Sequence, residues 1–132
     1  MPKFMLLQNY EGGQACSAPM AEWSLEEIRS HIAFQQVLNA ELLDKGEFVD
    51  AQGLSGPELA KKVVSDGVGA PVVTDGPFAE GKELLAGYRI VDVESEDRAL
   101  EIAAKISAAP GPGGVAIQQP IEVRQVMSAP SV

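Results

Sequence analysis

The order of the apolar segments predicts an α+β fold: strand, helix, strand, β-hairpin, strand, helix and strand. Two β-α-β units with a hairpin inserted between them are typical of a ferredoxin-like βαββαβ sandwich, in which both helices cover one face of an antiparallel sheet. A third observation is the long strand Leu84–Val93, which is apolar on both faces and needs cover on both. The 132 residues suit a single domain, residues 1–132.

Local patterns define the first strand and helix. Phe4–Asn9 reads as a buried strand, and the Gly-, Ser- and Pro-rich segment Tyr10–Ala21 reads as a loop. Ser24, followed three residues later by Glu27, forms a capping-box pattern, because each side chain can bond the backbone amide of the other. The helix is expected to continue to about Lys45, because the next residue is a glycine that can end it.

A β-hairpin is expected between the two units. The strand Glu47–Leu54 is broken by Ser55–Pro57, and two short β segments follow, Ala60–Ser65 and Pro71–Thr74. The dipeptide Asp66-Gly67 between them is typical of a hairpin turn.

The second unit has clear boundaries. After the strand Leu84–Val93, Ser95 is expected to cap a second helix with acidic residues in its first turn, where the helix dipole favours them. The apolar side of this helix is expected to consist of Leu100, Ala103 and Ile106. Pro110–Gly114 ends the helix, Ile121–Met127 is the last strand, and residues 128–132 are expected to fray.

One protomer cannot cover both faces of this sheet. The alternating sets along the long strand are Leu84, Ala86, Tyr88 and Ile90 on one face, and Leu85, Gly87, Arg89 and Val91 on the other. The two helices cover one face, and no further segment can supply a layer for the other. We therefore expect a homodimer in which two sheets pack together.

The composition of the chain argues against several kinds of binding partner and site. The net charge of −9 would repel nucleic acid and anionic membrane surfaces, and no apolar segment is long enough to span a bilayer. The single cysteine, Cys16, and the absence of a visible secretory signal favour a cytoplasmic location. One Cys and one His cannot build the usual zinc site within one chain, and no cofactor motif is present.

Three polar residues lie in the middle of the apolar arc of the first helix. His31, Gln35 and Asn39 follow one another at intervals of four residues. Either they are satisfied polar groups of the core, or they line a polar cavity between helix and sheet. In the second interpretation His31 is an acid or base, because its side chain suits proton transfer near neutral pH. Its carboxylate partner would be Asp75, or alternatively Asp50.

The loop after Thr74 allows two interpretations. Its Asp-Gly-Pro sequence has the chemistry of an ordinary turn. Its density of charged residues also suits the rim of a pocket. In that case Asp75 would be a base or anchor, Lys82 an anion contact, and Tyr88 a hydroxyl donor. Arg89, together with Gln35 and Asn39, completes the candidate substrate-binding residues.

The same loop carries a family resemblance. Its matching residues are D-G-P-F-A-E at Asp75–Glu80, Lys82-Glu83 and Gly87-Tyr88. They resemble the DGPF signature of the YciI-like (YCII-related) family, although Gly81 stands where members often carry a larger polar residue. Lys3–Leu7 resembles the family's first strand and Ile121–Met127 its last, so the resemblance covers nearly the whole chain.

The resemblance implies a dimeric α+β barrel. It also implies an acid–base pair, since the YciI branch has a proposed pair of a His on the first helix and an Asp on the following strand. Here His31 lies about one helical turn before that position, and Gln35 is the closer match. Two functions remain open. The first is a small cytoplasmic acid–base enzyme of isomerase, lyase or dehydrohalogenase type, with a small organic substrate bound between helix and sheet. The second is a non-catalytic ligand-binding or regulatory accessory protein, because genes of DGPF-type proteins often lie beside those of extracytoplasmic-function sigma factors.

Overall fold

The computed structural model describes residues 1–9, 22–56, 59–75 and 85–128. Its elements are β1 (Lys3–Asn9), α1 (Leu25–Asp44), β2 (Phe48–Gly53), β3 (Lys61–Val64), β4 (Val72–Asp75), β5 (Leu85–Asp92), α2 (Glu96–Ser107), the 3-10 turn η3 (Pro112–Gly114) and β6 (Ile121–Gln125). These elements confirm the α+β class. Each expected helix and strand is found, with its ends within about two residues of the predicted ones.

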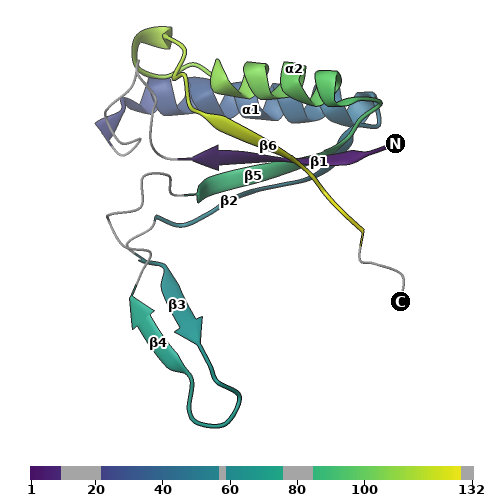
Figure 1. Ribbon diagram of the computed structural model, residues 1–132. Helices are drawn as coiled ribbons and strands as arrows, with labels where there is room; N and C mark the ends of the chain where they lie inside the picture. Colours follow the sequence, from purple (N-terminus) through teal and green to yellow (C-terminus); the bar gives the residue numbers. More distant parts are fainter. Residues whose placement is uncertain (10–21, 57–58, 76–84, 129–132) are drawn as a thin grey trace.

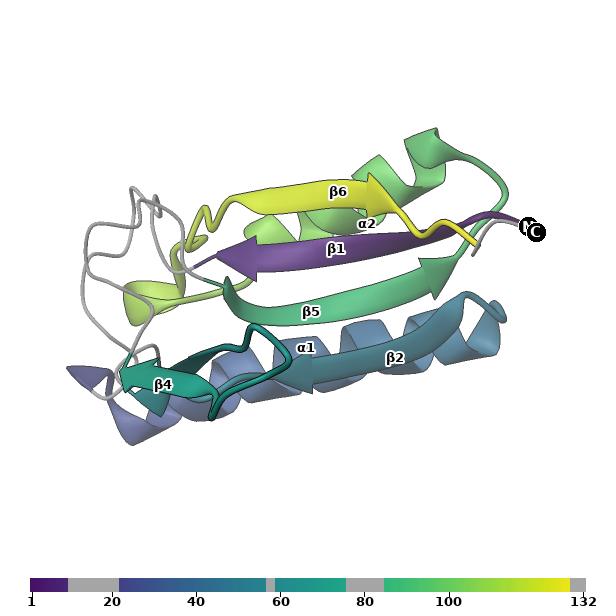
Figure 2. The same cartoon turned by 60° about the horizontal axis from the view of Figure 1, so that its bottom comes forward.

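Four strands form the main sheet. Their order is β2-β5-β1-β6, and every neighbouring pair is antiparallel (Figure 2). Both helices lie on the same face of this sheet (Figure 1). The strands β3 and β4 form a separate two-stranded sheet.

The helix ends follow the local patterns. The Ser24 hydroxyl accepts from the Glu27 amide at 3.1 Å, and the Glu27 carboxylate accepts from the Ser24 amide at 2.9 Å, so the capping box is confirmed. Gly46 follows α1 with a φ of 71°, a conformation that favours glycine. Ser95 caps α2 by accepting from the Arg98 amide.

The core lies between the helices and the sheet. Its buried residues are Phe4, Leu6, Leu38, Leu42, Val91, Val93, Ala99, Ile102, Ala103 and Ile106. One expectation was wrong, because Leu100 is 48% exposed. The buried side of α2 instead includes Ala99 and Ile102 along with the expected Ala103 and Ile106.

The other face of the sheet carries apolar side chains that neither described helix covers. Met5 pairs with Ile90 and Leu7 with Tyr88, and all four side chains are half-buried. Phe4 and Leu6, and the β5 residues that pair with them, point to the helix side instead, because successive residues of a strand point to opposite faces of the sheet. We call the surface formed by Met5, Leu7, Tyr88 and Ile90 the open face.

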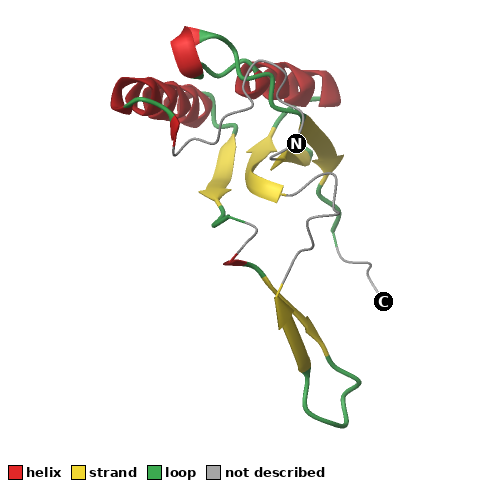
Figure 3. Ribbon diagram, turned by 90° about the vertical axis from the view of Figure 1, so that its left-hand side faces the viewer, coloured by secondary structure: helices red, strands yellow, loops and turns green. Residues whose placement is uncertain are grey.

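The β3–β4 hairpin extends away from the sheet on the side opposite the helices (Figures 1 and 3). Two valine pairs lie across it, Val63 with Val73 and Val64 with Val72, and these side chains are 58–63% exposed. The connection is longer than the predicted Asp66-Gly67 turn, since seven residues, 65–71, join the strands. The Asp66 carboxylate organises this loop by accepting from the amides of Val68 and Gly69.

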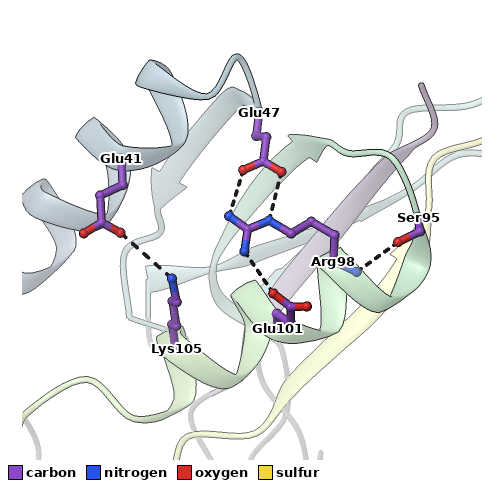
Figure 4. Close-up of polar contacts among 6 residues, drawn as sticks. All are labelled: Glu41, Glu47, Ser95, Arg98, Glu101 and Lys105. Carbon is purple, nitrogen blue, oxygen red and sulfur yellow. Dashed lines mark hydrogen bonds and ion pairs between the residues drawn. The ribbon is translucent and has the colours of Figure 1, made fainter.

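An ion pair joins the start of β2 to α2 (Figure 4). The Arg98 guanidinium donates from Nε and Nη2 to the two carboxylate oxygens of Glu47, at 2.9 and 2.8 Å, and from Nη1 to Glu101 at 3.1 Å. The Arg98 and Glu47 side chains are 14% and 11% exposed. These hydrogen bonds lower the pKa of Glu47 and raise that of Arg98.

Gly87 is required by the close approach of β2 and β5. A Cβ at this position would lie 2.8 Å from the backbone oxygen of Gln52. We expect Gly87→Ala to lower the free energy of unfolding by about 1–3 kcal/mol, because backbone atoms must move apart. Urea denaturation measures the change. Gly53→Ala is the matched control, since its Cβ would meet nothing within 4 Å, and an equal loss in both variants would contradict the explanation.

Candidate functional site

A chain of polar side chains connects α1 to β5. His31, Gln35 and Asn39 lie along one side of α1. Gln35 and Asn39 contact Arg89, which projects from β5 on the helix side of the sheet, and His31 is connected to Arg89 through Gln35. The Arg89 Nε donates to the Asn39 Oδ1 at 2.9 Å, and its Nη2 donates to the Gln35 Oε1. The structure therefore brings together four of the predicted site residues.

The hydrogen-bond partners of His31 assign its tautomer. The Pro110 carbonyl, 3.0 Å from the His31 Nδ1, can only accept, so Nδ1 carries the hydrogen. Arg89 can only donate, so it binds the oxygen of the Gln35 amide, and the amide nitrogen lies 3.3 Å from the His31 Nε2. In this tautomer the imidazole accepts at Nε2, the arrangement that a general base needs.

The N-terminal end of α1 forms the surroundings of His31. The Trp23 ring meets the imidazole edge to face, with ring centres 5.5 Å apart. A nearby hollow of about 330 Å³ is lined by Ser24, Glu26, Glu27, Ser30, Gly111, Gly113 and Gly114. Glu27 lines one wall of this hollow, where its carboxylate accepts from the Gly113 amide at 2.8 Å. Hydrogen bonds from the Ser24 amide and then from the Gly113 amide lower the pKa of Glu27.

Arg89 is the most buried charged residue of this cluster. Only 3% of its surface is exposed, and burial lowers its pKa to about 10, so the guanidinium is still charged at neutral pH. In the part of the chain that the structure describes, its two hydrogen-bond partners are neutral amides, and no carboxylate lies within ion-pair distance.

Tyr88 belongs to a different group. It neighbours Arg89 in β5 and therefore lies on the open face. Its hydroxyl donates to the Asp50 Oδ2 at 3.1 Å, and this bond raises the pKa of Tyr88. Gln52 also donates to Asp50, at 3.3 Å. The predicted binding residues are thus divided between the two faces of the sheet.

The predicted partner of His31 lies elsewhere. Asp75 ends β4, its side chain is 86% exposed, and it accepts from the Lys61 Nζ at 2.5 Å. Asp50, the alternative, bonds Tyr88 on the open face. Among residues 1–9, 22–56, 59–75 and 85–128, no carboxylate bonds the His31 ring, so the expected pair of His31 with Asp75 is not formed. Lys82 lies outside the described residues.

Comparison with known proteins identifies the family. The YCII-related domain matches residues 3–122. The chain belongs to the YCII-related family. An uncharacterized protein of Rhizobium meliloti (strain 1021) is 32% identical over 87 residues, which cover 66% of this chain and 69% of that protein.

Two neighbours of His31 in this YCII-related protein were missed in the sequence. Pro110 was interpreted only as the end of α2, and Trp23 lies at the start of α1, yet both contact the imidazole. Pro110 has no sequence signal for this role, because its contact with His31 joins residues 79 positions apart.

The described residues of the YCII-related chain contain no group of three or more His, Cys, Asp or Glu side chains arranged to hold a metal ion. Neither α1 nor α2 is long and apolar enough to cross a membrane.

Proposed function

We propose that this YCII-related protein is an acid–base enzyme of the cytoplasm that acts on a small organic molecule bound between α1 and the sheet. The observation that carries the proposal is the orientation of His31. Its Nδ1 is engaged by a backbone carbonyl and its Nε2 is left as an acceptor toward the Gln35 amide. A substrate that displaces this weak contact would find a neutral imidazole ready to take a proton.

The assembly belongs to the same proposal. The strand order β2-β5-β1-β6, with both helices on one face, supports a ferredoxin-like sandwich. The apolar open face supports a dimeric barrel in which two sheets pack together. The motif at Asp75–Glu80 supports a place in the DGPF branch of the family.

The alternative is a non-catalytic ligand-binding or regulatory accessory protein. One observation favours it: the described residues offer no carboxylate to the His31 ring, so the imidazole has no acid–base partner of the kind found in catalytic dyads. A ligand could still bind the Arg89 cluster without any proton being transferred.

Proton abstraction can be tested without knowledge of the product. The wild type is incubated in D₂O with a set of small carbonyl compounds and organic acids, and NMR follows the exchange of C–H for C–D. We expect exchange in at least one compound, and His31→Gln should slow it about 10²–10⁴-fold. Arg29→Gln, at an exposed position of the same helix, should keep the wild-type rate. Binding of a compound without exchange would favour the accessory protein.

A further inference from the structure

The guanidinium of Arg89 lacks a counter-charge in the described structure. A buried cation in a protein normally pairs with a carboxylate, because taking a charge out of water costs several kcal/mol unless an opposite charge or strong hydrogen bonds compensate it. Arg89 has two neutral amide oxygens instead, from Gln35 and Asn39. Burial lowers the pKa of this guanidinium to about 10.

Part of this guanidinium is still available for binding. Nε and Nη2 each donate one hydrogen bond, whereas Nη1 has no partner among the described residues. The Nη1–Nη2 edge can therefore donate to both oxygens of an incoming oxyanion.

We propose that Arg89 anchors the carboxylate of a small organic acid, which is the ligand of the site that contains His31. The inference rests on the proposed function, because it names the substrate class for that site. One Gln35 amide bonds both the guanidinium and the imidazole. A carboxylate held by Arg89 thus lies one amide group away from the proposed base.

A carboxylate fits better than a phosphate. A single guanidinium balances one negative charge, and a phosphate dianion would leave an excess charge in a protein whose net charge is already −9. Gln35 and Asn39 lie in the middle of α1, so the helix N-terminus that often helps to bind phosphate is not at this position.

The test is an NMR titration of the Arg89 Nε–H signal in the full chain, with formate and acetate as probes and inorganic phosphate as a second arm, at constant ionic strength. We expect a saturable shift with both carboxylates in the millimolar range and a smaller effect of phosphate. Arg89→Gln should remove saturable binding of the carboxylates, measured by the shift of neighbouring amide signals. Arg124→Gln, at a 72% exposed arginine, should leave the titration unchanged.

Three results would overturn the inference: no saturable shift in the wild type, equal binding by Arg89→Gln, or saturation by phosphate alone. The titration of the wild type shows by itself whether carboxylates bind saturably at Arg89, even if Arg89→Gln does not fold. His31→Gln separates the inference from the proposed function. If carboxylates bind both the wild type and this variant, and neither exchanges C–H protons, the anion site stands and the acid–base function fails.

Discussion

Replacing Arg98 by Met is expected to lower the free energy of unfolding by about 2–3 kcal/mol at neutral pH. The Glu47 side chain, 11% exposed in the wild type, would lose both of its hydrogen bonds from the guanidinium. The Met side chain fills part of the space that Arg98 occupied. The decrease in the free energy of unfolding would therefore come from the unpaired Glu47 charge more than from a cavity. Urea denaturation at pH 7 measures it.

The same variant should change the response to acid. Hydrogen bonds from Arg98 are the main cause that lowers the pKa of Glu47 below its usual 4.5. A carboxyl with a lowered folded-state pKa stabilises the protein fully above pH 4.5, and this contribution is lost as the pH falls through the folded-state pKa. The difference in stability between wild type and Arg98→Met should therefore shrink in acid.

The outer partner of Arg98 supplies the control. Glu101 is 66% exposed, and exposed ion pairs contribute little. Glu101→Gln should cost less than about 0.5 kcal/mol and leave the pH dependence nearly unchanged. A loss as large as that of Arg98→Met would show that the contact of Arg98 with Glu101 within α2, and not the pair with Glu47, stabilises the fold.

Local chemistry explains what the sequence could predict. The caps at Ser24 and Ser95 depend on residues within one helical turn, so both were predictable. The apolar side of α2 was predicted less well. Leu100 and Ile102 lie about 200° apart around the helix, and the buried side is the i, i+3, i+4, i+7 set that contains Ile102, whereas Leu100 is exposed. The position of the hairpin was predictable from the strand-breaking residues Ser55–Pro57 and the turn Asp66-Gly67, but the exposure of its valines was not.

The candidate site was predictable in its parts and not in its arrangement. The spacing of His31, Gln35 and Asn39 revealed a polar stripe on an apolar arc. Arg89 contacts this polar stripe because of the way β5 packs against α1. These contacts join residues 50 or more positions apart, so local sequence patterns do not reveal them. The interpretation of Asp75 as a partner of His31 rested on residue chemistry alone, with no sequence signal that places the two side chains together, and in the structure Asp75 bonds Lys61.

The proposed dimer predicts that Ile90→Glu yields a monomer. Ile90 lies on the open face opposite Met5, and its side chain is half-buried in the single protomer. In a symmetric assembly each new carboxylate would be buried in an apolar interface, and its copy would add like-charge repulsion. Sedimentation equilibrium should show twice the protomer mass for the wild type and 13.9 kDa for the variant.

Leu100→Glu tests whether any added acidic residue separates the protomers. Leu100 is 48% exposed on α2, on the opposite side of the sheet from the open face. This variant carries the same added charge, so it should remain a dimer if the open face is the interface. Ile90→Glu should stay folded, because the core between helices and sheet does not include Ile90. A wild-type protein that sediments as a folded 13.9-kDa particle at every concentration would contradict the dimer, since association follows mass action.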